Sequence, residues 1–479
     1  MVDADRRTVA RWAIAIILTG IVARVAWAAW IAHAEPLAVR SPDTPGYVWP
    51  ARALIEAGRF SLSPTDATPM FVRTPGYPAF LAAIMWVTDS EWAISPIQAA
   101  LSALTVVTIV LVGWRLIGLT AGLVAGSLLV LDPLQFIASG TILTEATASI
   151  TIALIAAVGV LIFAVRRPPD VPIGAVIGLG VLVALATIVR PTMWFYPAVL
   201  LVLLAMRSRG LPRRARVARL LAFLLPVALV VGGWQVRNHA TVSSWQLSGA
   251  TGLLMYCSNA AQIEARTSGT SMDATQRRFG CPVSGEDPDG VCRSDAGWTC
   301  RIPDPDAAGQ GFDDWNRKGL EIMADHPVQT ARIMAEGVVR QIAGPGTDTV
   351  RRYFDMRGSG PLAMGLFLWN AILWALAAVG AVAGLRSRHR AYWAFVVVTI
   401  GYVVIVSTGD AAGARYRVPV IPLLALLAAC GLQSGVQKLR DRESRRASAR
   451  EQIVSHRTRG RRPVGSALAT GLEDGHGLA

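Results

Sequence analysis

Apolar runs of bilayer length recur along this 479-residue chain and leave little choice of fold. A helix that crosses a membrane needs roughly 17 to 25 predominantly apolar residues. Runs of this kind occur near residues 11–33, 95–117, 120–138, 146–165, 172–190, 193–206, 217–236, 361–385, 391–408 and 416–434. Because 53% of the residues are hydrophobic and only 16% are charged, the composition is also that of a membrane protein. We therefore expect an all-α polytopic membrane protein with about ten transmembrane helices.

Two apolar segments are less regular than the others. The run at 193–206 is short for a span, and GYPAFLAAIMWV (76–87) fits either an interfacial helix or a partial span. The first run, in contrast, is longer than the roughly 7 to 15 residues of a signal-peptide core. We expect it to be an uncleaved anchor, although AHA at 32–34 has the small residues of a cleavage site.

The positions of Lys and Arg predict the orientation of the helices, because basic residues collect in cytoplasmic loops. With ten spans counted, the basic segments fall on one side of the membrane: Arg6, Arg7, Arg11, Arg115, Arg166, Arg167, 207–219, 386–390 and the tail after Lys438. We expect a multi-pass protein of the cell membrane with both termini in the cytoplasm and its active site outside. This topology accounts for the net charge of +14, so membrane lipids are expected partners and nucleic acid is not.

The same count of spans divides the chain into six parts. They are the N-terminus with the first transmembrane helix (1–33), a first outer loop with the catalytic candidate and juxtamembrane helices (34–94), a transmembrane bundle (95–236), a long extracytoplasmic loop (237–360), the C-terminal transmembrane helices (361–435) and a basic, disordered cytoplasmic tail (436–479).

The long extracytoplasmic loop contains Cys257, Cys281, Cys292 and Cys300. An even number of cysteines on the side of the membrane where disulfides persist predicts two disulfides. A zinc site is less consistent with the sequence, because the spacings of 24, 11 and 8 residues match no pair of close ligands and no His stands within the cluster. The sequence predicts a small cap stabilised by disulfides.

Acidic residues dominate the part of this loop between 286 and 325. They lack the alternating spacing and the central Gly of a calcium-binding EF-hand, so we interpret them as a solvated surface. Residues 312–342 then show helical periodicity, which predicts amphipathic helices near the membrane surface.

Asp43, in the string SPDTPGY (41–47), is the candidate catalytic residue. Pro42 and Pro45 flank it, so its backbone is stiff and cannot continue a helix. A carboxylate held in this way can act as a general base if an attacking hydroxyl comes within hydrogen-bond reach. The plainer interpretation is an Asp that stabilises a turn, which is common in such strings.

Other polar residues at the predicted outer ends of the spans are candidates for substrate binding. Guanidinium groups bind phosphate through paired hydrogen bonds, so several arginines at one depth in the membrane would suit the phosphate of a lipid. Each arginine alone is typical of a side chain whose charged end reaches the membrane–water interface. Glu145 suits the start of a helix, and it could also hydrogen-bond a sugar or assist Asp43. The candidates are Tyr47, Arg73, Glu145, Arg190, Arg237 and Arg415.

Several strings, in their order along the chain, resemble a known superfamily. They are SPDTPGYVWPARALIEAGRFS, RTPGYPAFLA, SGTILTEATAS, VRPTMWFYPAVLL, WQVRNHATVSSWQLSGATGLLMYCSN and ARYRVPVIPLLALLAACGL. The chain resembles the GT-C membrane glycosyltransferases and is most similar to the bacterial relatives of the dolichyl-phosphate-mannose protein mannosyltransferases, which are like glycosyltransferase family 39. The resemblance covers most of residues 1–435.

The resemblance implies an inverting glycosyltransferase with a polyprenyl-phosphate sugar as donor and a hydroxyl of a protein, lipid or polysaccharide as acceptor. Asp43 matches the proposed catalytic base, Glu145 matches an acid of the second outer loop, and Arg190, Arg237 and Arg415 match positions where cations approach the phosphate. Thr44 stands where the family often has a second acid, which is a departure from its pattern. No cofactor is implied; some members of the wider class use a divalent metal, but the acids of this sequence form no clear metal site.

Two other functions are compatible with a bundle of apolar helices. A transporter is favoured by Arg24, which lies near the middle of the first span, but the chain has no second half that repeats the first. A ligase or flippase for lipid-linked glycans would share the same membrane bundle, so hydropathy does not separate it from a transferase.

Overall fold

The structure, a computed structural model, is almost entirely helical and describes residues 2–36, 39–164, 168–281, 292–293, 299–300, 305–346 and 360–459. It divides into two compact units, Met1–Gly431 and Leu432–Ala479. The second unit contains the C-terminal part of the last helix, α20 (Ile421–Arg459). The sequence predicted a disordered tail from 436, whereas helix continues to Arg459 because the segment is rich in Ala, Arg, Glu and Gln, which favour helix.

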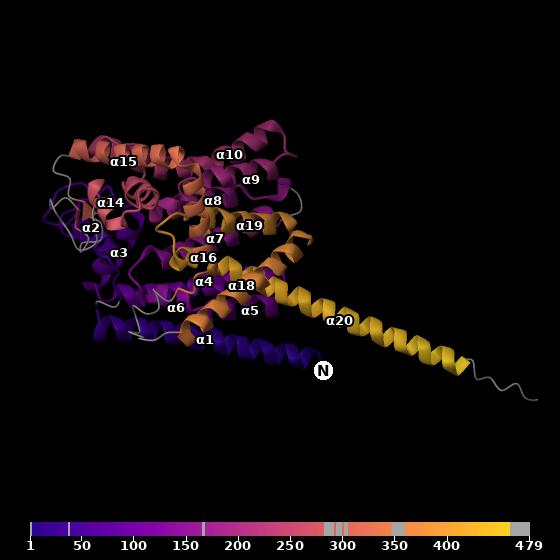
Figure 1. Cartoon of the computed structure of the whole chain (residues 1–479). Helices are drawn as coiled ribbons and strands as arrows, with labels where there is room; N and C mark the ends of the chain where they lie inside the picture. Colours follow the sequence, from indigo (N-terminus) through magenta and orange to yellow (C-terminus); the bar gives the residue numbers. More distant parts are fainter. Residues whose placement is uncertain are drawn as a thin grey trace, which may run out of the picture. The chain divides into compact units, whose positions relative to one another are not determined.

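The first unit consists of apolar helices with a smaller group of helices at one end (Figure 1). The apolar helices are α1 (Val2–Ala34), α4 (Ile94–Leu116), α5 (Leu119–Leu131), α6 (Pro133–Gly140), α7 (Thr144–Phe163), α8 (Ile173–Val189), α9 (Tyr196–Arg207), α10 (Arg213–Val227), α11 (Gly233–Val242), α18 (Gly360–Leu385), α19 (Arg390–Val406) and the first turns of α20. Short 3₁₀ or π segments stand at η1 (Pro168–Asp170), η2 (Pro191–Met193), η3 (Ala228–Gly232) and η5 (Ala414–Val420).

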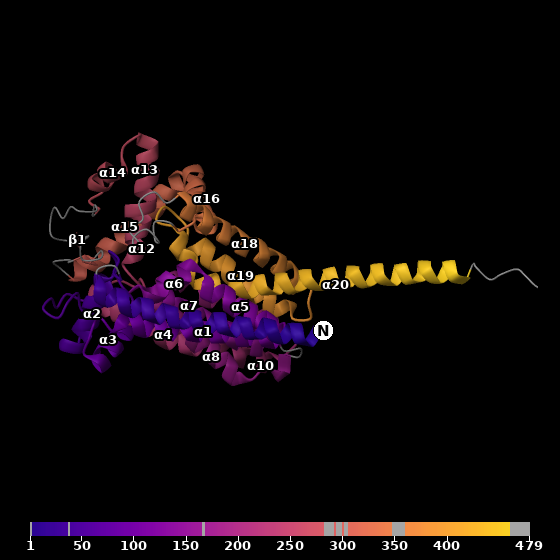
Figure 2. The ribbon, with the colours of Figure 1, turned by 90° about the horizontal axis from the view of Figure 1, so that it is seen from below.

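We call this smaller group of helices the cap. It comprises α2 (Pro45–Glu56), α3 (Gly76–Thr88), α12 (Ala250–Gly252), the π segment η4 (Leu253–Ala260), α13 (Ala261–Ser268), α14 (Met272–Arg278), β1 (Cys292–Arg293), β2 (Thr299–Cys300), α15 (Pro305–Asp325) and α16 (Pro327–Ala343). Figures 1 and 2 show α2, α3, α14 and α15 together at the end of the bundle opposite the start of α1.

The predicted membrane-spanning class is confirmed. Among the described residues, six helices are long and apolar enough to cross a membrane, or up to seven if the bent pair α5 and α6 is one span. The sequence predicted about ten spans; the other three predicted spans fall on shorter apolar helices at 173–189, 191–207 and 390–406, and a further short apolar helix occupies 76–88. The irregular segments at 193–206 and 76–87 are among these shorter helices.

The bent pair shows why one predicted span is not continuous. The sequence predicts a single helix over 120–138, but α5 and α6 meet at 64° beside Asp132 and Pro133. Pro133 has no amide hydrogen to continue the helix, and the Asp132 carboxylate accepts a hydrogen bond from the amide of Gln135, 2.9 Å away, at the start of α6. Trp369 also donates to this carboxylate, at 2.9 Å.

Arg24 donates hydrogen bonds to the carbonyls on the α5 side of the same break. Its side chain is 1% exposed, and its Nη2 donates to the carbonyls of Leu129 at 2.7 Å and Val130 at 3.1 Å, at the C-terminal end of α5. Carbonyls released by a helix break need a donor where water is absent. Arg24 is therefore explained by the fold, which removes the main sequence feature that favoured a transporter.

Close contact between backbones holds α4 against α5. A side chain on Gly113 would put its Cβ 2.6 Å from the Cα of Gly122, closer than real Cβ atoms come. Small residues at such positions let membrane helices pack through their backbones.

The cap is stabilised by a disulfide and by aromatic packing. Cys257 in η4 and Cys281 after α14 form the disulfide. Cys292 and Cys300 are directly opposite in the antiparallel pair β1 and β2, but their side chains lie outside the described residues. The predicted amphipathic segment 312–342 corresponds to α15 and α16, which separate at Pro327. Phe312 and Trp315 of α15 pack in a cluster with Phe71 of the loop before α3.

We predict that Arg24→Met destabilises the protein by about 1 to 3 kcal/mol, because it leaves carbonyls at the end of α5 without a donor. The thermal midpoint of purified protein in detergent should fall. Arg11→Met, an exposed position on the same helix, is the matched control and should leave the midpoint unchanged. A midpoint that is equal in both variants would contradict the structural role of Arg24.

Candidate active site

The loop that carries Asp43 is fixed by hydroxyl groups on both sides of it. The Thr44 hydroxyl accepts a hydrogen bond from the amide of Ser41 at 2.8 Å and donates to the carbonyl of Ile142 at 2.9 Å. The amide of Asp43 donates to the Ser41 hydroxyl at 3.1 Å. Thr44 is 1% exposed, and its bond to Ile142 ties this loop to the segment before α7.

Asp43 makes ion pairs with two arginines that are far apart in the sequence. Arg73 Nη2 donates to Oδ1 at 2.8 Å, and Arg415 Nη2 donates to Oδ2 at 3.2 Å. Burial alone would raise the pKa of Asp43, but these two charges and hydrogen bonds outweigh it and lower the pKa to about 2. Both carboxylate oxygens are thus occupied, and the group is ionised at neutral pH.

The lowered pKa also gives the sign of the pH dependence. An ordinary Asp titrates near pH 3.9. Because the folded protein holds Asp43 ionised to about pH 2, its ion pairs contribute stability above about pH 4 that is lost as the pH falls towards 2. Titration of Asp43 therefore does not affect stability between pH 5 and 8.

Tyr47, the third residue of α2, completes the surroundings of Arg73. Its hydroxyl accepts from Arg73 Nη1 at 3.2 Å, and its ring lies 4.7 Å from the guanidinium carbon. The ring also meets Tyr77 edge to face, with centroids 5.1 Å apart. Burial raises the pKa of Tyr47, so the phenol stays neutral and keeps a proton that it can donate.

Glu145 and Arg190 form a second, more deeply buried ion pair. Arg190 Nη1 is 3.4 Å from Glu145 Oε1, and their side chains are 7% and 8% exposed. The other carboxylate oxygen, Glu145 Oε2, is buried and has no hydrogen-bond partner among the described residues. A buried carboxylate oxygen without a donor is costly unless a ligand or water supplies one.

Tyr416 connects the two ion-paired groups. Its ring lies 5.3 Å from the guanidinium carbon of Arg190 and 5.2 Å from that of Arg415. Cations over the faces of aromatic rings are attracted by the π electrons. Tyr416 is not among the residues that the sequence predicted; its position between Arg415 and Arg417 in ARYRV is the only signal for it.

The structure therefore brings six of the seven sequence candidates into one chain of contacts, which we call the acid–arginine cluster. It comprises Asp43, Tyr47, Arg73, Glu145, Arg190, Arg415 and, in addition, Tyr416. Its members stand where α2 and α7 begin, in the loop before α3, where α8 ends and where η5 begins. Three guanidinium groups face two carboxylates, so the cluster has one net positive charge.

Arg237, the seventh candidate, has different partners. Its Nη1 donates to the carbonyl of Met70 at 2.9 Å and its Nη2 to that of Phe60 at 3.1 Å. The guanidinium also lies over the ring of Trp234, 4.8 Å from its centroid. These contacts hold the loop between α2 and α3 against α11, which is a structural role.

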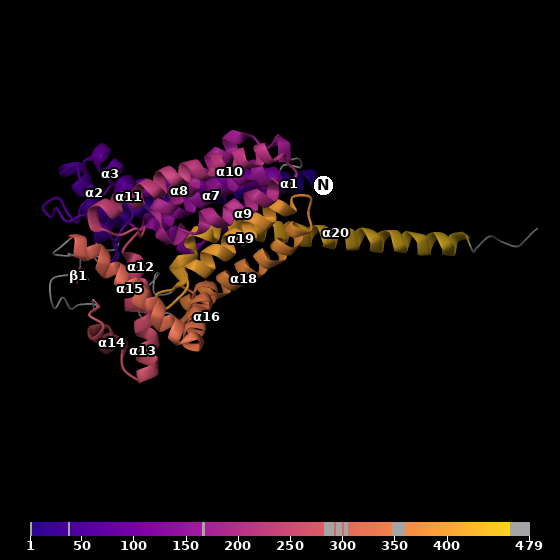
Figure 3. The ribbon, with the colours of Figure 1, turned by 90° about the horizontal axis from the view of Figure 1, so that it is seen from above.

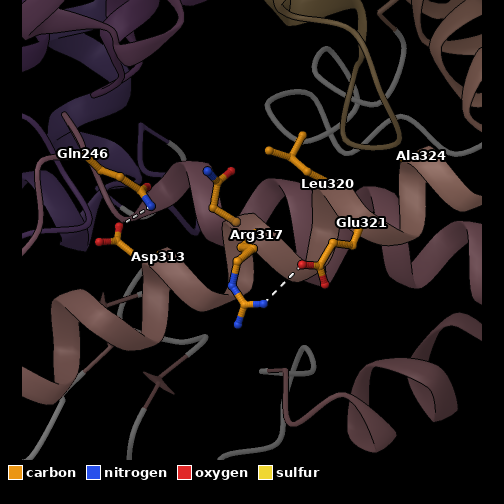
Figure 4. Close-up of a pocket in the computed structure, with 7 residues that line it drawn as sticks. Gln246, Asp313, Arg317, Leu320, Glu321 and Ala324 are labelled. Carbon is orange, nitrogen blue, oxygen red and sulfur yellow. Dashed lines mark hydrogen bonds and ion pairs between the residues drawn. The ribbon is translucent and has the colours of Figure 1, made fainter.

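A separate cleft of about 540 Å³ runs along one side of α15 (Figure 4). Gln246 reaches towards Asp313 from the loop after α11, and Arg317 pairs with Glu321 at 3.2 Å. Asn316, Leu320 and Ala324 complete the lining, which shares no residue with the acid–arginine cluster. Among the described residues, no group of three or more His, Cys, Asp and Glu could hold a metal ion.

Comparison with known proteins gives matches among solved structures only. No protein-family model matches the chain, and no curated protein matches it. The archaeal oligosaccharyltransferase AglB from Archaeoglobus fulgidus, in complex with an inhibitory peptide and a dolichol-phosphate, is 12% identical with a TM-score of 0.48; the match covers 91% of this chain and 52% of that one. The apo form of the oligosaccharyltransferase from the same organism is 11% identical with a TM-score of 0.49, over the same shares.

ArnT from Cupriavidus metallidurans bound to undecaprenyl phosphate is a further match. It is 13% identical with a TM-score of 0.38, over 86% of this chain and 77% of that one. The chain spans about half the length of the oligosaccharyltransferase. At these identities and TM-scores the similarity assigns neither an activity nor a site residue to this chain.

We predict that Arg237→Gln loosens the loop between α2 and α3 and lowers stability by about 1 to 3 kcal/mol, because two partly buried carbonyls lose a charged donor. Limited proteolysis should cut within 60–70 faster, and the thermal midpoint should fall. Arg59→Gln is the matched control: Arg59 is an exposed residue of the same loop that donates to one carbonyl, that of Pro64. Equal proteolysis of both variants would show that Arg237 does not hold the loop.

Proposed function

We propose that this chain is a membrane glycosyltransferase that moves a sugar from a polyprenyl-phosphate carrier to an acceptor hydroxyl at the outer face of the membrane, with inversion at the sugar. The observation that carries the proposal is the acid–arginine cluster. Its residues come from five separate parts of the sequence, yet they converge at the cap end of the bundle.

The charge and location of the cluster suit a lipid-linked phosphate. Guanidinium groups bind phosphate oxygens through paired, charge-assisted hydrogen bonds. Arg190 follows the last residue of α8, and Arg415 is the second residue of η5, so both stand at the ends of apolar helices. A polyprenyl chain lying among those helices would hold its phosphate at the same depth, which confines the reacting carbon beside the cluster.

The reaction needs a base for the acceptor and positive charge for the leaving group. The acceptor oxygen attacks the anomeric carbon on the side opposite the phosphate and forms the new glycosidic bond. The bond from that carbon to the phosphate oxygen breaks, and its electron pair leaves with the polyprenyl phosphate. Asp43 takes the acceptor's proton, while the arginines stabilise the charge on the phosphate.

Asp43 cannot accept a proton readily while both its oxygens are paired with arginines. A base with a pKa of about 2 is weak at neutral pH. A donor phosphate competes with Asp43 for the same guanidinium groups, and Arg415 has the longer contact, 3.2 Å, and the more exposed side chain, 35%. When Arg415 turns to the phosphate, Oδ2 is released and the pKa of Asp43 rises. Donor binding thus activates the base.

Glu145 is placed to orient the sugar. Its free oxygen, Oε2, can accept a hydrogen bond from a sugar hydroxyl, which would supply the missing donor. Tyr47 can donate its phenolic proton to a phosphate or sugar oxygen. Both contacts would fix the anomeric carbon relative to Asp43 rather than take part in bond breaking.

We predict that Asp43→Asn separates donor binding from transfer. Transfer of radiolabelled sugar from a panel of polyprenyl-phosphate sugars should fall by a factor of about 100 or more, since general base catalysis is lost. Binding of undecaprenyl phosphate should become several-fold tighter, because the arginines no longer pair with a carboxylate. Undiminished transfer, or weaker binding of undecaprenyl phosphate, would contradict the proposed role of Asp43.

Arg415→Gln should have the opposite effect on binding. Loss of one charged hydrogen-bond donor to phosphate corresponds to a roughly 10- to 100-fold weaker affinity for undecaprenyl phosphate. The control is Arg317→Gln, which changes an exposed arginine of α15 outside the cluster. If Arg415→Gln binds undecaprenyl phosphate as tightly as this control, the cluster is not a phosphate site.

A further inference from the structure

The segment that bears Arg415 and Tyr416 is irregular and depends on the cap for its shape. Between the end of α19 at Val406 and the start of η5 at Ala414 the backbone forms no helix. The amides of Ser407, Thr408 and Ala412 bond to nearby carbonyls, but several carbonyls of the segment take donors from elsewhere. Most of the partners come from α16, which lies beside α18 and α19 in Figures 2 and 3.

Arg340 makes the central contacts. Its Nη2 donates to the carbonyls of Gly409 at 2.8 Å and Asp410 at 3.0 Å, and its Nε donates to the carbonyl of Ala412 at 3.0 Å. One planar guanidinium thus spans four consecutive residues of the turn. Arg415 is three residues after Ala412, the last residue whose carbonyl Arg340 binds. Arg340 therefore fixes the backbone that leads into η5.

Residues on both sides of Arg340 also form hydrogen bonds between α16 and the segment 407–417. Gln341 donates to the carbonyl of Ser407 at 2.7 Å, and the Thr408 hydroxyl donates to that of Met334 at 2.6 Å. In the other direction, Arg417 donates to the carbonyls of Gln341 at 2.7 Å and Gly344 at 2.6 Å. The segment 407–417 is held to α16 at both of its ends.

Two glycines let the backbones come close enough for these bonds. A Cβ on Gly337 of α16 would lie 2.6 Å from the amide nitrogen of Gly409. Gly409 itself has φ +117°, a conformation that other residues rarely adopt. The turn is completed by Asn259 of η4, whose Oδ1 accepts from the amide of Asp410 at 2.8 Å.

We propose that Arg340 is a positioning residue, which sets Arg415 against Asp43 and so makes the cap helix α16 a part of the phosphate-binding site. This inference rests on the proposed function. Arg340 itself contacts backbone carbonyls, and its Nη1 lies 3.9 Å from the carboxylate oxygen Oε2 of Glu336. It therefore acts through Arg415 and not on the substrate.

A double-mutant cycle tests this inference on full-length protein, with undecaprenyl phosphate alone as the probe. Arg340→Gln should weaken binding roughly tenfold when Arg415 is present, and less than about twofold in the Arg415→Gln background. A residue that acts only through Arg415 has nothing left to position once Arg415 is gone. Arg332→Gln is the matched control, since Arg332 is an exposed residue of the same helix that also pairs with Glu336.

Two further variants keep the test informative if Arg340→Gln folds poorly. Arg340→Lys should recover part of the affinity, because an ammonium group can reach one or two of the three carbonyls. Asn259→Ala removes a different contact of the same turn and should show the same dependence on Arg415.

The outcomes separate the two proposals. If Arg415→Gln does not weaken binding, the phosphate site itself is wrong. If Arg415→Gln weakens binding but Arg340→Gln and Asn259→Ala do not, or if their effects add fully to that of Arg415→Gln, Arg340 does not position Arg415. A loss of affinity equal to that of Arg332→Gln would overturn the inference as well.

Discussion

The apolar surroundings of these helices require a partner for every backbone carbonyl and amide, and much of the structure follows from that requirement. A regular helix meets it internally, but this chain interrupts its helices at several places. The break between α5 and α6, the loop before α3 and the turn before η5 each expose carbonyls. An arginine satisfies each of them: Arg24, Arg237 and Arg340 respectively.

The arginines of the molecule therefore fall into two groups with different chemistry. Arg24, Arg237, Arg340 and Arg417 donate to backbone carbonyls and hold irregular segments in place. Arg73, Arg190 and Arg415 face carboxylates and aromatic rings at the cap end of the bundle. Charges bound to carboxylates can be exchanged for another anion such as a phosphate. Removing a charge that is bound to carbonyls at a helix break lowers the stability of the fold.

The cluster of exchangeable charges depends on the fixed ones. Arg415 and Tyr416 follow a turn whose carbonyls are held by Arg340, and Arg73 follows the loop that Arg237 holds at Phe60 and Met70. Thr44 and Ser41 fix Asp43 in the same way from the first loop. The proposed transferase site is thus built on three irregular segments, each anchored by hydrogen bonds to a helix or a loop outside the cluster.

The sequence by itself determined the membrane class, the helices and most of the candidate residues. Hydropathy needs only the order of apolar residues, so the predicted spans correspond to helices, and flanking prolines marked Asp43 as held outside a helix. The sequence did not predict the bend at Asp132, the helical tail to Arg459 or the role of Tyr416. Nor could it separate Arg237 from Arg415, because both are arginines beside the end of an apolar run. Only the tertiary structure decided which guanidinium meets a carboxylate and which meets carbonyls, since those partners lie 372 residues away for Arg415 and 167 or more for Arg237.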